Sequence, residues 1–384
     1  MISLVQQTIS TSELQKLSEW LDTNPRLTKG DLNDQFEQKW SKWLGKKHSI
    51  FVNSGSSANL AAFYALKLSD RLKNNKVVIP TVSWATTVAP AIQLGFEPIL
   101  CDCNLENLGL NIEHLEELVD KHNPSMIVAV NVLGFANNYD KIKEICEQKD
   151  IILLEDSCES VGTVAYGKKT GCFGDIATFS FFYGHHMSTV EGGMVCTDDE
   201  SLATLLKSIR SHGWDRDISE KSRNYLRNKY SIDNFNAPYT FYYPGFNLRC
   251  TEIQAFLGIG QLKKLDEIIK KRYQNFNLYQ ARLGGINCLS LQDHDIVSNF
   301  AYPIIHNKSK QISQGLNELG ISHRPLIAGS ISKQPFWIDR YGSQKLINGE
   351  LIHTNGFYVP NNHEISYDEI QLICDTIIRE IKTT

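Results

Sequence analysis

Short apolar segments alternate with helical segments through the first 200 residues, and this alternation constrains the fold more than any other feature. Segments typical of strands occupy residues 49–52, 77–79, 98–100, 126–130, 151–154, 176–182 and 194–196. Strands that are apolar throughout, such as Ile151-Ile152-Leu153-Leu154, are buried on both faces. The sequence therefore predicts an α/β fold with a mixed, mostly parallel sheet flanked by helices, which binds its ligand at the carboxyl ends of the strands.

The predicted helices suggest a division into two parts. Helices are expected at 11–21, 32–44, from residue 58, and at 112–121, 139–148, 251–279, 311–319 and 367–381. Residues 214–243 are polar and aromatic without a clear period, so we expect a functional loop there. We predict a large domain over residues 1–250, and a long connecting helix with a smaller C-terminal α/β domain over residues 251–384.

Charge and composition argue against several classes of function. The net charge is −4 and no basic block is present, so no nucleic-acid partner is expected. No apolar run reaches the roughly 18 residues of a membrane span, and the N-terminus lacks a secretory pattern, so we expect a cytoplasmic protein without a membrane partner. The nine scattered cysteines suggest reduced thiols, and their spacing predicts no metal site.

Three short segments carry groups suited to chemistry. Asn53-Ser54-Gly55-Ser56-Ser57 joins a strand to a helix, as in a phosphate site, although an ordinary helix cap has the same pattern. Asp156 ends a buried strand, where a carboxylate needs a cation or several hydrogen bonds, and helix capping is the alternative. Two adjacent histidines, His185 and His186, follow another strand and suit an acid or base role, although a structural histidine is the alternative.

The order and spacing of these segments resemble the DegT/DnrJ/EryC1/StrS sugar aminotransferases, which have the aspartate aminotransferase fold. The resemblance covers nearly the whole chain and includes residues 53–56, 80–86, 155–156 and 245–249. It implies a homodimer with shared active sites that binds pyridoxal or pyridoxamine 5'-phosphate. The implied cofactor contacts are Gly55, Ser56 and Ser180 at the phosphate, Trp84 on the ring, Asp156 at the ring nitrogen, Glu159 near the ring hydroxyl, and Asn247 from the neighbouring subunit, with Arg249 near the substrate. Core packing is the alternative for Trp84, and a structural ion pair is the alternative for Arg249.

The chain departs from the family pattern at His185. In the family, a lysine lies five residues after a serine, and a Glu-Gly-Gly sequence begins six residues after that lysine. Here Ser180, His185 and Glu191 keep this spacing, but a histidine stands in place of the lysine. A lysine tethers the cofactor, which imidazole cannot do. Among relatives, this replacement marks the 3-dehydratases of 4-keto-6-deoxy sugar nucleotides, lyases that serve dideoxysugar synthesis for surface polysaccharides such as lipopolysaccharide O-antigen or capsule.

The resemblance implies a particular reaction. The expected substrate is a GDP-linked 4-keto-6-deoxy sugar, a hexose or heptose, which loses its C3 oxygen; ammonia is released, and glutamate restores pyridoxamine phosphate. Two other interpretations remain, an aminotransferase that uses Lys168 or Lys169 and a non-catalytic binding protein on the same fold. A related dehydratase adds an iron–sulfur cluster, but residues 211–249 contain no cysteine, so we expect neither a cluster nor a reductase partner.

Overall fold

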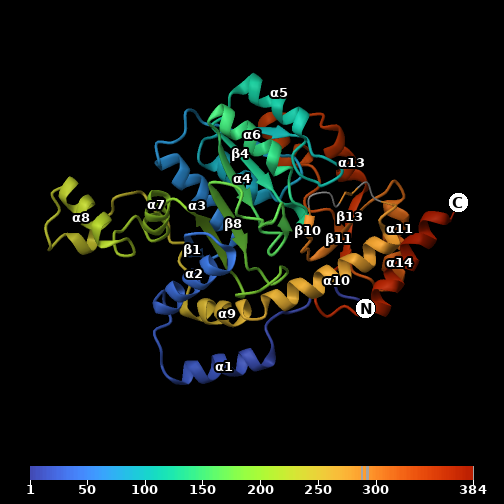
Figure 1. The fold of residues 1–384 in the computed structure, drawn as a ribbon, viewed down its shortest axis with the longest axis horizontal. Coiled ribbons are helices and arrows are strands. Elements are labelled where there is room, and N and C mark those ends of the chain that lie inside the picture. Colours follow the sequence, from blue (N-terminus) through green and yellow to red (C-terminus); the bar gives the residue numbers. More distant parts are fainter. Residues whose placement is uncertain (287–288, 291–293, 384) are drawn as a thin grey trace.

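A seven-stranded sheet forms the centre of the computed structural model, which describes residues 1–286, 289–290 and 294–383 (Figure 1). The strand order is β1-β9-β8-β5-β4-β2-β3. Strands β3, β2, β4, β5 and β8 run parallel, whereas β9 is antiparallel to both β8 and β1. This confirms the predicted mixed, mostly parallel sheet. The bounds are β1 His48–Val52, β2 Lys76–Pro80, β3 Glu97–Cys101, β4 Met126–Val130, β5 Ile152–Asp156, β8 Ile176–Ser180 and β9 Gly193–Thr197.

Helices cover both faces of this sheet because consecutive strand residues point to opposite sides. Val77 and Ile79 enter one hydrophobic cluster, which includes apolar residues of α3, and Val78 enters another, which includes apolar residues of α5 and α6. The continuous apolar strands thus have the two-sided burial that the sequence predicts. The helices of this part are α1 Thr11–Asp22, α2 Asp31–Leu44, α3 Gly55–Leu68, α4 Ala85–Gln93, α5 Ile112–His122, α6 Tyr139–Lys149 and α7 Glu200–Arg210.

A smaller antiparallel sheet, ordered β11-β13-β12, lies toward the end of the molecule where both termini are found (Figure 1). Its strands are β11 Ala301–Ile305, β12 Arg324–Pro325 and β13 Gly356–Pro360, and its helices are α11 Ser309–Glu318, α12 Pro335–Tyr341, α13 Ile347–Asn355 and α14 Tyr367–Lys382. A third sheet joins β10 (His294–Ile296) to β6 (Val164–Ala165) and β7 (Lys168–Lys169). One hydrophobic cluster runs through both parts, so the boundary at residue 250 stays a prediction.

Two expectations about helices need correction. The single helix expected over 251–279 is two helices, α9 Glu252–Leu262 and α10 Leu265–Leu283, which are separated at Lys264. The backbone of Lys264 leaves helical values (φ −110°, ψ 0°), and its ammonium group contacts Glu13 and the Thr8 carbonyl, which ties the break to the N-terminal segment.

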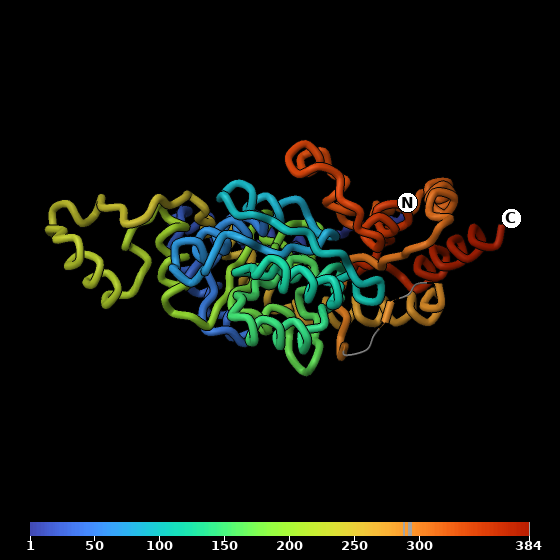
Figure 2. Tube along the Cα trace, turned by 90° about the horizontal axis from the view of Figure 1, so that it is seen from above, coloured from blue at the N-terminus to red at the C-terminus, as the bar shows by residue number. Residues whose placement is uncertain are grey.

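The second correction concerns residues 214–243, which contain α8 Glu220–Lys229 and a 3-10 turn, Ala237–Tyr239. Ser219 caps α8, but Leu226 is its only buried residue, so no apolar stripe reveals the helix in the sequence. Figures 1 and 2 show this segment projecting from the body of the molecule, at the end opposite to the two termini. Two other 3-10 turns, Val132–Gly134 and Ile331–Lys333, complete the helical elements.

None of the helices that can be described has both the length and the apolar character needed to cross a membrane.

Candidate active site

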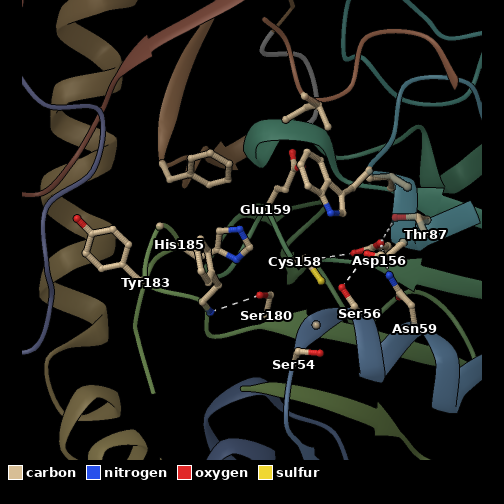
Figure 3. A pocket seen from close by; sticks show the side chains of 18 of the residues that line it. Ser54, Ser56, Asn59, Thr87, Asp156, Cys158, Glu159, Ser180, Tyr183 and His185 are labelled. Carbon is tan, nitrogen blue, oxygen red and sulfur yellow. Dashed lines mark hydrogen bonds between the residues drawn. The ribbon is translucent and has the colours of Figure 1, made fainter. Parts of the chain in front are cut away.

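A cavity of about 370 Å³ opens at the carboxyl ends of β5 and β8, beside the N-terminus of α3 (Figure 3). This is the edge of the sheet at which a ligand was expected. Seven residues selected from the sequence line it, namely Gly55, Ser56, Trp84, Asp156, Glu159, Ser180 and His185. Residues far apart along the chain therefore meet around one cavity of a size suited to a small molecule.

The first turn of α3 forms a tight cradle against β8. Ser54 caps the helix by accepting a hydrogen bond from the Ser57 N–H, at 3.0 Å. A Cβ atom on Gly55 would lie 2.6 Å from Ser180 Cβ and 3.2 Å from Cys158 Sγ, so glycine permits this close approach. The Ser56 hydroxyl lies 2.8 Å from Thr86 Oγ1. A helix N-terminus bordered by hydroxyl groups is well suited to bind a phosphate.

Asp156 ends β5 as a buried carboxylate with three neutral donors. Its Oδ2 accepts hydrogen bonds from Asn59 Nδ2 at 2.9 Å and Thr87 Oγ1 at 2.7 Å, and its Oδ1 accepts one from the Cys158 N–H at 3.2 Å. These bonds fix the orientation of the carboxylate at the cavity wall. A protonated ring nitrogen of a bound ligand would complete the ion pair that a buried carboxylate favours.

Glu159 is a second buried carboxyl group at the cavity wall. Burial raises the pKa of the Glu159 carboxyl to about 8, and the negative charge of Asp156 contributes in the same direction. Its Oε2 accepts a hydrogen bond from the Leu133 N–H at 2.9 Å. At neutral pH the side chain is therefore mainly an uncharged acid, which can donate a hydrogen bond to a ligand.

His185 lies on the loop after β8, with its imidazole directed into the cavity, away from Tyr183 (Figure 3). The ring stacks on Phe300, with 5.2 Å between centroids. Burial lowers the pKa of His185 to about 4, so the ring is neutral at pH 7. A neutral imidazole that is directed into the cavity can act as a base.

His186 occupies a different environment although it is the next residue. It is fully buried, does not line the cavity, and its Nε2 lies 3.1 Å from the Ser298 carbonyl oxygen. Since adjacent side chains leave the backbone in different directions, one histidine faces the cavity and the other packs inside the protein. Of the two histidines, His185 is therefore the one that a ligand in the cavity could reach.

Trp84 lines the cavity, and 55% of the residue is exposed. It precedes α4, so its indole projects from the helix start and does not pack into the core. An exposed aromatic ring beside an open cavity is available to stack on a planar ligand.

Asn247 and Arg249 do not line this cavity, although the sequence places both in the site. Asn247 Oδ1 accepts a hydrogen bond from Arg249 Nε at 3.0 Å, and Arg249 also contacts His212 at 3.3 Å. The two residues lie together beside residues 211–214. Asn247 and Arg249 thus lie outside the cavity of their own chain. A residue that contributes to the site of a neighbouring subunit would have such a position.

Several residues of the site were not selected from the sequence. Asn59 and Thr87 orient Asp156, Phe300 stacks on His185, and Arg324 and Tyr358 line the cavity from the smaller sheet. Asn59 lies four residues after Gly55, so helical spacing from the phosphate turn could have indicated it. The other contacts join segments that are distant in sequence, and no local pattern marks them.

No lysine lines the cavity among the residues that the structure describes. Lys169 lies on β7, where its ammonium donates to the Trp43 carbonyl at 2.6 Å and sits over the Trp43 ring. Lys168, also on β7, is exposed. Within the described ranges, no cluster of His, Cys, Asp or Glu has the geometry to hold a metal ion.

A mostly parallel sheet, with a helix N-terminus, a buried aspartate and a neutral histidine around one cavity, fits the pyridoxal-phosphate-dependent enzymes of the aspartate aminotransferase fold. The family model described as the DegT/DnrJ/EryC1/StrS aminotransferase family matches residues 7–378. The chain belongs to this family.

Comparison with individual relatives gives more detail. GDP-4-keto-6-deoxy-D-mannose 3-dehydratase of Escherichia coli O55:H7 is 35% identical over 362 residues, which cover 91% of this chain and 92% of the relative. A mutant GDP-4-keto-6-deoxymannose-3-dehydratase with bound GDP-perosamine has a TM-score of 0.89 and 33% identity, covering 98% of this chain and 100% of its own. The same enzyme with a trapped PLP-glutamate geminal diamine has a TM-score of 0.88 and 32% identity, with coverage of 98% and 100%.

Proposed function

We propose that this protein is a pyridoxamine-phosphate-dependent 3-dehydratase of a GDP-linked 4-keto-6-deoxy sugar, with glutamate as the amino donor. The observation that carries the proposal is His185, which faces the cavity at the place where the family's aminotransferases have a lysine. The similarity to GDP-4-keto-6-deoxy-D-mannose 3-dehydratases along nearly the whole chain supports the substrate class.

The residues around the cavity fit the cofactor. We assign its phosphate to the α3 N-terminus with Gly55, Ser56 and Ser180, where a Cβ on Gly55 would close the space. Asp156, which has only neutral hydrogen-bond donors, would pair with the protonated ring nitrogen. When bound, pyridoxamine phosphate supplies an amine that condenses with the 4-keto group and a ring that accepts electrons.

The environment of His185 suits both proton transfers of the proposed reaction. With the cofactor bound, the neutral imidazole would serve as the base at its reactive carbon, because the ring faces the cavity and is uncharged at neutral pH. The imidazolium that results is a strong acid, since burial lowers the pKa of His185 to about 4. It can therefore return the proton to the departing C3 oxygen. Asp156 would hold the ring nitrogen of the bound cofactor in its protonated form, and Glu159, mainly uncharged at neutral pH, would donate a hydrogen bond to the ring hydroxyl.

Product analysis tests this proposal directly. The holoenzyme is incubated with GDP-4-keto-6-deoxy-D-mannose and glutamate, and the products are followed by NMR with assays for ammonia and 2-oxoglutarate. We expect a 3-deoxy sugar and both small products. A 4-amino sugar without ammonia would instead indicate an aminotransferase. No reaction with hexose or heptose substrates would leave the binding-protein interpretation.

We further propose that the enzyme is a homodimer whose active sites are shared. Asn247 and Arg249 lie outside the cavity of their own chain, which supports a role at the site of a second copy. Mixing His185→Asn and Asn247→Ala chains tests this. If each site combines the two chains, heterodimers contain one intact site and recover activity that neither variant has alone. Activity that stays absent in confirmed heterodimers would contradict the shared arrangement.

A further inference from the structure

Arg272 is a buried cation on α10 that faces the back of the active-site loop. Only 2% of the residue is exposed, and no carboxylate pairs with it in the ranges that the structure describes. Burial lowers the pKa of its guanidinium to about 9, so the group still carries a positive charge at neutral pH. A buried charge without a counter-ion is costly unless its N–H groups are hydrogen-bonded. Its partners therefore indicate what it does.

These partners are three backbone carbonyl groups from different segments. Nη1 donates to the Asn361 carbonyl at 2.7 Å and more weakly to the Asn299 carbonyl at 3.5 Å. Nη2 donates to the carbonyl of His185 itself, at 3.2 Å. One guanidinium thus joins the loop after β8 to the segments before β11 and after β13.

The same contacts hold the surface against which the imidazole packs. Phe300, which stacks on His185, directly follows Asn299. The Asn361 amide returns hydrogen bonds to the Arg272 carbonyl at 3.1 Å and to the Asn299 carbonyl at 3.3 Å. The backbone of His185 and the segment that carries its stacking ring are therefore both held by Arg272.

We propose that Arg272 is a positioning residue that fixes the imidazole of His185 against Phe300. Its charge has a second, smaller effect on the same ring. The consequence for turnover rests on the proposed function, whereas the effect on the imidazole does not.

The charges around His185 predict the direction of the second effect. Burial is the largest cause of the low pKa of His185, and the charge of Arg272 lowers that pKa further, whereas the Ser180 backbone and the charge of Asp156 raise it. The neighbouring His186 is itself neutral because burial, with the charge of Arg272, lowers its pKa, and Glu159, in the same cavity, is mainly uncharged at pH 7. Removing the charge of Arg272 takes away one of the two causes that lower the pKa of His185, so this pKa should rise.

The imidazole can be titrated without relying on catalysis. In the apoprotein, diethylpyrocarbonate modifies neutral histidine, and peptide mass spectrometry reports the rate at His185 between pH 5 and 8. We expect a nearly constant rate for wild type and for Arg272→Lys, which keeps the charge. For Arg272→Met, the rate at pH 5 should fall to about half of its value at pH 8, because a rise of about one pH unit brings the pKa of His185 near 5. A rate at pH 5 that stays as high as in wild type would overturn the effect of the charge.

Turnover tests the positioning part. Lysine cannot span three carbonyl groups, so Arg272→Lys should lower kcat about 10- to 100-fold, with KM for the sugar and glutamate within about threefold of wild type. Asn275→Leu is the matched control, because Asn275 also lies on α10 and donates to the Asn362 carbonyl at 3.1 Å without touching His185. It should keep wild-type kcat.

The outcomes separate this proposal from the proposed function. If Arg272→Met does not fold by circular dichroism, Arg272→Lys and its kcat decide the matter. Wild-type kcat in Arg272→Lys, or an equal loss in Asn275→Leu, would overturn the positioning role. A wild-type enzyme that forms no 3-deoxy sugar would sink the proposed function but leave the His185 titration interpretable.

Discussion

Replacing Gly55 with alanine should weaken cofactor binding without unfolding the protein. The new Cβ would lie 2.6 Å from Ser180 Cβ, and the two carbons must separate by about 0.8 Å to reach ordinary contact at 3.4 Å. Such overpacking costs about 1–3 kcal/mol. The apoprotein can relax by moving α3 away from β8, but binding a phosphate between them restores the strain. The dissociation constant of pyridoxamine phosphate should therefore rise about 5- to 150-fold.

Absorbance titration of the apoprotein with pyridoxamine phosphate measures this constant. Gly285→Ala is the control, because nothing lies within 4 Å of its added Cβ, and it should bind as wild type does. A double-mutant cycle tests the cause: in a Ser180→Gly background the clashing carbon is absent, so the penalty of Gly55→Ala should largely disappear. Binding by Gly55→Ala within twofold of wild type, or an equal penalty in both backgrounds, would refute the reasoning.

The other predictions concern protonation, covalent binding and stability. His185→Asn should abolish dehydration while the cofactor affinity stays within a few-fold of that of wild type, and turnover by this variant would contradict the base role. His185→Lys should hold the cofactor covalently, which an absorbance shift that borohydride makes permanent would show. The pKa of Glu159 is raised to about 8 in the folded protein from an unfolded value near 4.5, so the stability that this group contributes to the apoprotein should be lost as pH rises from about 4.5 to 8. Urea unfolding measured across this pH range should show the loss in wild type but not in Glu159→Gln. Arg210 is buried between Glu37 and Asp217, so Arg210→Met should lower the free energy of unfolding by about 3–5 kcal/mol in urea, and a loss below about 1 kcal/mol would mean that the pair is not effectively buried.

Local sequence patterns were sufficient for the sheet, whereas the residues around the cavity were selected through the resemblance to the family. Continuous apolar strands determine two-sided burial, and the small residues before α3 determine a close turn, because both depend on neighbours in the chain. The spacing from Ser180 selected His185, which the structure places in the cavity. The pattern failed for α8, which has no apolar stripe, and at Lys264, where contacts with the N-terminal segment accompany the break between α9 and α10.

The sequence by itself determined which residue types stand at the carboxyl ends of β5 and β8. Only the tertiary structure decided their chemical state. His185 and Glu159 have pKa values displaced in opposite senses, downward and upward, because burial disfavours the charged form of each, and burial depends on segments far away in the chain. Phe300 and Arg272 reach His185 from beyond residue 250 for the same reason: a contact between distant segments leaves no periodic trace in either of them.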